Sequence, residues 1–339
     1  MTEKERLLAV LAGQKVDRPP CICPGGMMNM TTTQIAAAAH VSFPAAHIDP
    51  QEMARLSRAS HDMAGLENYG APFCMTVEAE AMGAVADLGD ETCEPHVIAG
   101  VLAGASDLSA IHPIDVTQGR AATTIEAIRL LKEGNDDVPV VGNLVGPVSV
   151  AGTLLDFEKL LREMRRHPDD CHKLLAYVVD SLVVYGHAML EAGADVICIA
   201  EPSGTGEILG PKWFGEFTVH YLNELTRKLA APYIIVHICG KLERVLDEIA
   251  HIRCDGFSFD AVTVPSYVRA HLPGTALMGN VSTFALRSQD AVRVDALTQA
   301  ALRQSLDVIA PACGISMSTP TENLLAMTDR VRKGTEHGR

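Results

Sequence analysis

One stretch of the chain reads Tyr233-Ile234-Ile235-Val236-His237-Ile238-Cys239-Gly240, an apolar, β-branched run that ends in two soft metal ligands and a glycine. Uninterrupted apolar runs of this length are typical of parallel strands, which are covered on both faces and need not alternate. His237 and Cys239 are two positions apart, so at a strand end their side chains point to the same side. This spacing predicts two corners of a tetrahedral zinc site.

Similar apolar runs alternate with helical patterns from residue 72 onward. The candidate strands are 73–77, 110–116, 138–144, 195–200, 233–238, 256–259, 276–279 and 307–310. Eight strands with intervening helices predict an α/β fold of the (β/α)8 TIM barrel class. An open, doubly wound sheet is the alternative, but no G-x-G-x-x-G pattern follows the first strand. We expect residues 1–70 to form a helical segment packed on the barrel and residues 71–339 to form the barrel, within one structural domain.

The composition of the chain limits which binding partners and which cellular compartment we expect. The chain has 339 residues, of which 47% are hydrophobic, and 42 acidic against 28 basic residues give a formal charge of −14. No basic run is present, which excludes nucleic acid as a partner. The N-terminus lacks a signal-peptide pattern. The sequence has no uncharged apolar stretch long enough to predict a membrane span. Nine cysteines without framework spacing indicate reduced thiols, so we expect a cytoplasmic protein.

Polar or metal-binding side chains follow nearly every predicted strand. They are Glu78, Glu80, Asn143, Glu201, His237, Cys239, Asp260, Asn280 and Cys313. A barrel brings such strand ends to one mouth, where Cys313 would join His237 and Cys239. Two thiolates and one imidazole leave one zinc position open, which is typical of a catalytic site. Such a zinc lowers the pKa of a bound thiol, and its two sulfur ligands favour alkyl transfer to that thiol over hydrolysis.

Several of these cysteines have a simpler interpretation. A single cysteine in an apolar strand is usually a small buried hydrophobe, which we favour for Cys74, Cys198 and Cys254. Cys21-x-Cys23 is a competing soft-ligand pair, but its place before Pro24-Gly25-Gly26 favours a loop or a buried site.

Other candidate residues also have two interpretations. Glu78 and Glu80 are either functional or helix-start carboxylates favoured by the helix dipole. Met27, Met28 and Met30 are either packing residues or an adaptable binding surface.

Two segments are the most specific part of a family resemblance: Val236-His237-Ile238-Cys239-Gly240 and Ala310-Pro311-Ala312-Cys313-Gly314-Ile315. With supporting segments at 72–83, 146–147, 201–203, 278–282 and 319–323, the chain resembles the uroporphyrinogen decarboxylase superfamily. It is most similar to the zinc-dependent branch, the methylcobamide:coenzyme M methyltransferases of methanogenic pathways. The resemblance extends over nearly the whole chain.

The resemblance implies a (β/α)8 barrel whose zinc ion, Zn2+, is held by His237, Cys239 and Cys313. Those enzymes move a methyl group from the methylcobamide of a separate corrinoid protein to the zinc-bound thiol of coenzyme M. On this chain the barrel mouth would bind coenzyme M or a similar small thiol and receive the corrinoid partner. The resemblance places Glu201 near the zinc, as a catalytic residue that is either a displaceable fourth ligand or an orienting group.

The other strand-end residues, Glu78, Glu80, Asn143 and Asn280, are assigned to binding the cofactor. The chain departs from the family at 281–290, where the usual Pro and Gly-Thr-Pro turn are missing. Residues 27–30 lack the arginine-bearing pattern of true decarboxylases, which weakens a uroporphyrinogen decarboxylase-type lyase as the alternative. Methyl transfer to another acceptor, or a non-catalytic zinc-stapled scaffold, are the remaining alternatives.

Overall fold

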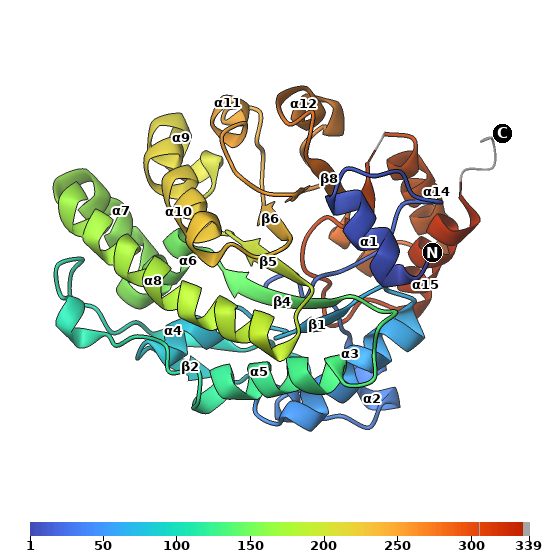
Figure 1. The fold of residues 1–339 in the computed structure, drawn as a ribbon, viewed down its shortest axis with the longest axis horizontal. Coiled ribbons are helices and arrows are strands. Elements are labelled where there is room, and N and C mark those ends of the chain that lie inside the picture. Colours follow the sequence, from blue (N-terminus) through green and yellow to red (C-terminus); the bar gives the residue numbers. More distant parts are fainter. Residues whose placement is uncertain (305, 335–339) are drawn as a thin grey trace.

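The computed structural model describes residues 1–304 and 306–334, and its centre is a curled parallel sheet (Figure 1). Seven strands follow one another in the order β1-β4-β5-β6-β7-β8-β9, each hydrogen-bonded to the next. They are β1 (Tyr69–Ala71), β4 (Val140–Val145), β5 (Val196–Ala200), β6 (Ile234–Ile238), β7 (Gly256–Phe259), β8 (Ala276–Val281) and β9 (Val308–Pro311). All the pairings between these strands are parallel, so their carboxyl ends meet at one mouth.

The ring is closed by a short extended segment around Cys21 that lies between β9 and β1. Cys21 forms a parallel bridge with Ile309 of β9. On its other side, the Cys21 carbonyl accepts a hydrogen bond from the backbone N–H of Glu67 at 2.8 Å. The Asn68 side chain also pairs with the backbone of Cys23, accepting from its N–H at 3.0 Å and donating to its carbonyl at 2.9 Å. The segment therefore occupies the eighth strand position, and the predicted barrel is confirmed.

Two of the predicted strands are wrong. Residues 73–77 lead into helix α4 (Val77–Ala81), and the sheet uses β1 just before them. Residues 110–116 are extended chain after the 3-10 turn Leu108–Ala110, although Ile111 and Ile114 are buried. Short apolar runs report burial more reliably than they report strand pairing, because a loop that covers a core is apolar too.

The N-terminal region contains α1 (Glu3–Leu11), α2 (Thr33–Ala38) and α3 (Pro50–Ala64). A capping box precedes α1: Thr2 Oγ1 accepts from Glu5 N at 3.1 Å, and Glu5 Oε2 accepts from Thr2 N at 2.9 Å. Asp49 caps α3 through Gln51 N and Glu52 N. The Cys21 segment, although it lies in the N-terminal region, belongs to the barrel sheet. The boundary near residue 70 stays a prediction.

Helices surround the sheet on its outside (Figure 1). They are α5 (Gly119–Lys132), α6 (Pro147–Leu155), α7 (Phe157–Arg166), α8 (Pro168–Ala192), α9 (Gly206–Trp213), α10 (His220–Leu229), α11 (Leu246–Ile249), α12 (Pro265–His271), α13 (Thr283–Ser288), α14 (Ala291–Leu302) and α15 (Thr321–Lys333). Helix α8 is long and apolar enough to cross a membrane by length and composition alone. In this fold it packs against β4, β5, α5 and α10, so its apolar face belongs to the barrel.

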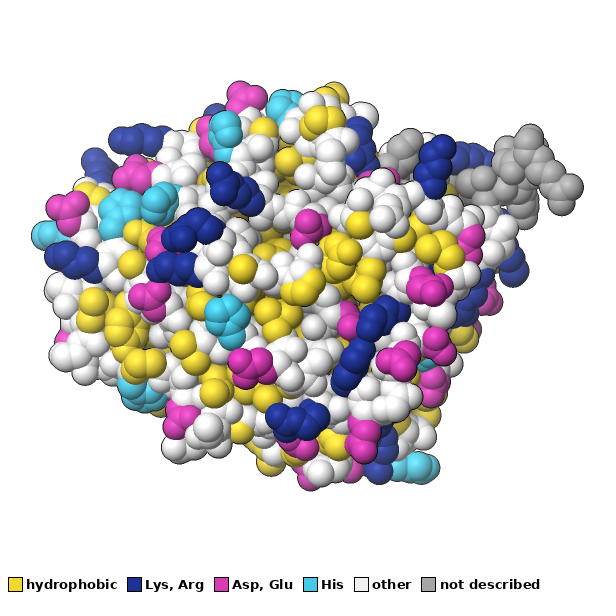
Figure 2. Space-filling view, in the orientation of Figure 1, with side chains coloured by type: hydrophobic (Ala, Val, Ile, Leu, Met, Phe, Trp, Pro, Cys, Tyr) yellow, Lys and Arg dark blue, Asp and Glu magenta, His cyan; other side chains and the backbone are white. Residues whose placement is uncertain are grey.

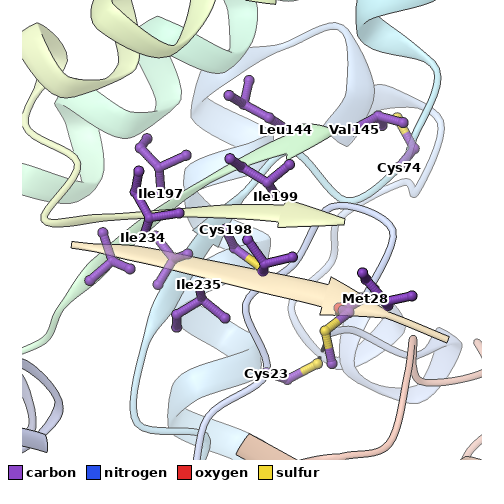
Figure 3. Packing of buried hydrophobic residues seen from close by; sticks show 14 of the residues in the cluster. Cys23, Met28, Cys74, Leu144, Val145, Ile197, Cys198, Ile199, Ile234 and Ile235 are labelled. Atoms are coloured by element: carbon purple, nitrogen blue, oxygen red, sulfur yellow. Dashed lines mark hydrogen bonds between the residues drawn. The ribbon is translucent and has the colours of Figure 1, made fainter. Parts of the chain in front are cut away.

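The core lies between the strands and these helices. Figure 3 shows Cys198 among the apolar side chains of β5 and β6, including Ile197, Ile199 and Ile235. Cys198 is 2% exposed, and burial raises its pKa to about 12, so it is the small buried hydrophobe that we predicted. Cys21 and Cys23 are also buried, as the second of their two interpretations requires.

The described lysine and arginine side chains are scattered among acidic ones on the face shown in Figure 2, without a continuous basic patch. An antiparallel hairpin of β2 (Val85–Asp87) and β3 (His96–Ala99) follows α4 and stands apart from the barrel sheet. The loop between its strands carries residues 88–95.

Candidate metal centre

The structure brings together the three residues that the sequence singled out as zinc ligands. His237 lies in β6 and Cys239 directly follows it, while Cys313 follows β9, on the far side of β7 and β8. His237 Nε2 lies 3.1 Å from Cys239 Sγ, and Cys239 Sγ lies 3.5 Å from Cys313 Sγ. All three ligand atoms lie within 4.8 Å of one another.

These separations fit one tetrahedral zinc ion. Two sulfur atoms bound to such an ion lie about 3.8 Å apart, and a sulfur and an imidazole nitrogen about 3.5 Å apart. The observed 3.5 Å between the two thiols and 3.1 Å between imidazole and thiol are only slightly shorter. Thiolate and imidazole are also the donors that select zinc over harder cations. Three protein ligands leave one position for a ligand from outside the chain.

His237 is oriented by a serine on the neighbouring strand. Its Nδ1 lies 2.9 Å from Ser258 Oγ, and both side chains are fully buried. Ser258 stands in register with His237 across β6 and β7, and its Oγ donates in turn to Met28 Sδ at 3.9 Å. With the proton on Nδ1, the Nε2 lone pair faces the two thiols, as metal binding requires. Sequence reasoning missed Ser258, although one polar residue in the apolar run of β7 was the available signal.

The two thiols interact with each other. The hydrogen bond from Cys239 lowers the pKa of the Cys313 thiol, and His237 lowers it further. The same contact, with burial, raises the pKa of Cys239, and the nearby Asp260 carboxylate adds to the rise. Met27 Sδ lies 3.7 Å from Cys313 Sγ, so one of the clustered methionines contacts the centre.

Glu201 lies outside this three-residue group. It is fully buried, and its Oε2 accepts a hydrogen bond from Val148 N at 2.9 Å, while its Oε1 accepts from Gly204 N at 3.1 Å and from the Ser149 hydroxyl. Burial raises the pKa of this carboxyl. Its backbone N–H donates to the His237 carbonyl at 2.9 Å, so Glu201 holds the end of β5 beside the ligand strand.

The two carboxylates of α4 have different surroundings. Glu78 is buried, with Oε1 accepting from Val145 N at 2.9 Å and Oε2 without a hydrogen-bond partner among the described residues. Burial raises the pKa of Glu78 to about 7. Glu80 is half-buried and accepts from Arg120 Nε at 2.5 Å. Arg120 also donates to Cys74 Sγ at 3.3 Å, so this cysteine is more than an inert hydrophobe.

The two asparagines donate to backbone carbonyls. Asn143 Nδ2 donates to Pro24 O at 2.9 Å and to Ala71 O at 3.1 Å, which ties the Cys21 segment to β1 and β4. Asn280 Nδ2 donates to the carbonyls of Asp260 and Thr263 at 3.3 and 3.2 Å. Neither asparagine is part of the three-residue group, and their assignment to cofactor binding stays a prediction.

The chain is similar to known proteins in both sequence and fold. The family model for uroporphyrinogen decarboxylase (URO-D) matches residues 2–334. The methylcobamide:CoM methyltransferase MtaA of Methanosarcina barkeri is 31% identical over 331 residues, which cover 96% of both chains. A solved methyltransferase from Methanosarcina mazei superposes with a TM-score of 0.92 at 29% identity, covering 98% of this chain and 99% of that one. A B12-independent methionine synthase from Shewanella sp. W3-18-1 shares the fold, with a TM-score of 0.62 at 15% identity and coverage of 92% of this chain and 98% of that one.

Proposed function

Since the chain belongs to the uroporphyrinogen decarboxylase (URO-D) family, we propose that it is the type of member that moves a methyl group from a methylated corrinoid protein to a small thiol. The observation that carries this proposal is the convergence of His237 Nε2 with the thiols of Cys239 and Cys313. A relative of nearly equal length is named a methylcobamide:CoM methyltransferase, which makes coenzyme M the first acceptor to test.

The three ligands would hold a zinc ion at the barrel mouth. When bound, zinc lowers the pKa of a thiol in its open position, so that the thiol is ionised at neutral pH. Ser258 keeps the Nε2 lone pair of His237 directed at the centre. The buried position of His237 excludes water from one side of the site and leaves the mouth as the route of entry.

The proposed reaction transfers a methyl group from cobalt to the sulfur of the acceptor thiol. The acceptor sulfur forms a bond to the methyl carbon as the cobalt–carbon bond breaks, and the bonding electron pair stays on cobalt to give cob(I)amide. The thiol proton passes to solvent. The methylcobamide arrives on a separate corrinoid protein, and the chain contributes orientation of the acceptor sulfur toward the methyl group. We place the reaction in the cytoplasm, where thiols stay reduced.

We assign Glu201 a positioning role in this reaction. Its hydrogen bonds to Val148 and Gly204 fix the loops after β4 and β5, and its backbone contacts His237. Glu78, Glu80, Asn143 and Asn280 would contribute to cofactor binding in the same indirect way, by holding segments at the mouth.

The proposal is tested by mixing the purified protein with methylcobalamin and coenzyme M and following the absorbance of cob(I)alamin. We expect demethylation that depends on stoichiometric zinc and is lost in His237→Ala, Cys239→Ala and Cys313→Ala. Cys198→Ala, a buried cysteine on β5 outside the group, is the matched control and should keep activity. Zinc-free protein with unchanged demethylation, or ligand variants that behave like the parent, would contradict the proposal.

A further inference from the structure

The three clustered methionines, Met27, Met28 and Met30, have different surroundings. The side chains of Met28 and Met30 are fully buried, and Met28 Sδ accepts from the Ser258 hydroxyl at 3.9 Å. Met27 is partly exposed, and its Sδ lies 3.7 Å from Cys313 Sγ. Packing therefore explains two of these methionines, and the interpretation as a binding surface is left for Met27 alone.

A tight turn carries Met27 at the mouth. An antiparallel bridge between Gly25 and Met28 closes the turn, and Gly26 N donates to Pro72 O at 2.7 Å. Gly25 and Gly26 have φ values of +101° and +61°, which glycine adopts without strain. The backbone of Met27 is therefore held in place by the fold.

The loop that carries Cys313 packs against this turn. Ile315 N donates to Asn29 O at 2.8 Å, just beyond the turn. A Cβ atom on Gly314 would lie 2.6 Å from Met27 O, so only glycine allows the two backbones to approach this closely. The Met27 backbone is thus fixed beside a metal ligand, whereas its unbranched side chain keeps rotatable bonds and can adapt to a neighbour.

Access to the metal centre runs past Met27. On the closed side of the centre, His237 and Ser258 are fully buried. On the other side, Cys239, Cys313 and Met27 are partly exposed. A ligand from outside the chain must therefore reach the centre on the side where Met27 lies.

An acceptor sulfur and Met27 Sδ would be neighbours of the same atom. Two sulfur atoms on one tetrahedral zinc ion lie about 3.8 Å apart, so an acceptor sulfur in the open position would contact Cys313 Sγ. Met27 Sδ already contacts that atom at 3.7 Å. A thioether is uncharged and adaptable, so it is suited to pack against the carbon that bears the acceptor sulfur.

We propose that Met27 determines which thiols the centre accepts, by packing against the carbon next to the acceptor sulfur and holding that sulfur at the open position. The site would favour thiols whose sulfur is on an unbranched carbon, because a branch there would collide with the methionine side chain. This inference rests on the proposed function and adds to it the wall that selects the acceptor.

The test compares ethanethiol with propane-2-thiol as acceptors for methylcobalamin. These uncharged thiols differ by one methyl group on the carbon that bears the sulfur, so an anchor for a charged tail plays no part. We expect kcat/KM for ethanethiol to exceed that for propane-2-thiol by about tenfold or more, the usual effect of one methyl group in an apolar pocket. Because the two thiols also differ in intrinsic reactivity, the decisive quantity is the change in this ratio between the parent and a variant.

Two substitutions separate the shape of the Met27 side chain from its sulfur. Met27→Ala should lower the ratio about tenfold, because it removes the wall. Met27→Leu keeps the volume and loses only the sulfur, so its ratio should stay close to that of the parent. Met63→Ala, the same change at a partly exposed methionine of α3, lies outside the metal centre and is the control.

Thiol binding without turnover gives a second readout. In protein loaded with Co2+ in place of zinc, an acceptor sulfur that binds the metal adds sulfur-to-cobalt absorption, which yields a dissociation constant for each thiol. Met27→Ala should raise the constant for ethanethiol about fourfold, the effect of losing contact with about one methylene group, and should change that for propane-2-thiol less. The zinc content of Met27→Ala should equal that of the parent.

The outcomes distinguish this inference from the proposed function. If no thiol demethylates methylcobalamin with the parent, the methyltransferase proposal fails, and the cobalt titrations still decide whether Met27 selects thiols. If the parent is active and Met27→Ala leaves the ratio and both dissociation constants unchanged, Met27 does not select the acceptor, while the methyltransferase proposal stands. Loss of zinc in Met27→Ala would also overturn the inference, because Met27 would then hold the metal rather than the acceptor.

Discussion

Replacing Ser258 by alanine removes the only hydroxyl that contacts the imidazole of His237 among the described residues. The lost bond is 2.9 Å long and joins two fully buried groups, so no bulk water replaces the hydroxyl. Partners of a metal-bound histidine typically contribute about 10- to 100-fold to metal affinity. We therefore expect zinc affinity to fall by that factor, which corresponds to about 1.4–2.8 kcal/mol.

Two measurements check this prediction. Competition with a chromophoric chelator gives the zinc dissociation constant, and denaturant unfolding of the metal-free protein gives the change in stability. Stability should fall by about 1–3 kcal/mol, because His237 Nδ1 is left buried without a partner. The control is Ser181→Ala in α8, whose hydroxyl donates to the Tyr177 carbonyl at 3.2 Å and lies outside the metal centre.

A Ser258→Ala protein that binds zinc as tightly as the parent would refute the reasoning. It would mean that the Nε2 lone pair of His237 is directed by the backbone of β6 alone. A loss of zinc affinity equal to that of Ser181→Ala would lead to the same conclusion, because it would reflect general destabilisation.

Three further predictions concern other parts of the molecule. Burial raises the pKa of Glu78 from 4.5 to about 7, so between these pH values only the folded state holds the proton. The free energy of unfolding of the unmodified protein should therefore fall by up to about 3 kcal/mol as pH rises from 4.5 to 7. Glu78→Gln should flatten this decline when unfolding is measured as a function of pH. Asn143→Ala should destabilise the fold by about 1–3 kcal/mol in denaturant titrations, because the Pro24 and Ala71 carbonyls lose a buried donor, and an unchanged midpoint would contradict this. Zinc removal with a chelator should lower the unfolding temperature. Adding zinc at about 100 times its dissociation constant should raise the free energy of unfolding again by about 2.7 kcal/mol. Cys313→Ala should respond to neither treatment.

The candidate metal centre could be predicted because its residues lie at or just after the ends of apolar runs, which the sequence identifies as strands. His237 and Cys239 end a long apolar run, and Cys313 follows another, so the barrel alone brings them together. The directions of side chains just beyond a strand are harder to predict, because the alternation of the strand has ended there. For Glu201, whose carboxylate accepts from the backbone N–H groups of Val148 and Gly204, a place beside the metal stays a prediction.

The eighth strand position was missed for a different reason. The segment around Cys21 is short, is bounded by Pro20 and Pro24, and pairs with the residues just before β1, partly through the Asn68 side chain. None of these features produces a periodic apolar pattern. Conversely, Ile111 and Ile114 are buried without belonging to a strand, so their hydrophobicity predicted one wrongly.

The bridge between Cys21 and Ile309, which closes the ring, affects how the chain folds as it leaves the ribosome. Ile309 lies in β9, so its bridge to Cys21 cannot form until that strand has emerged. Until then the Cys21 segment, which can already pair with Glu67 beside β1, lacks its other neighbour, and an open edge of this kind invites pairing with other chains. Cys313 emerges just after Ile309, so the third proposed metal ligand becomes available at the moment the ring can close. Binding of a metal by all three residues would thus accompany the closing of the ring rather than precede it.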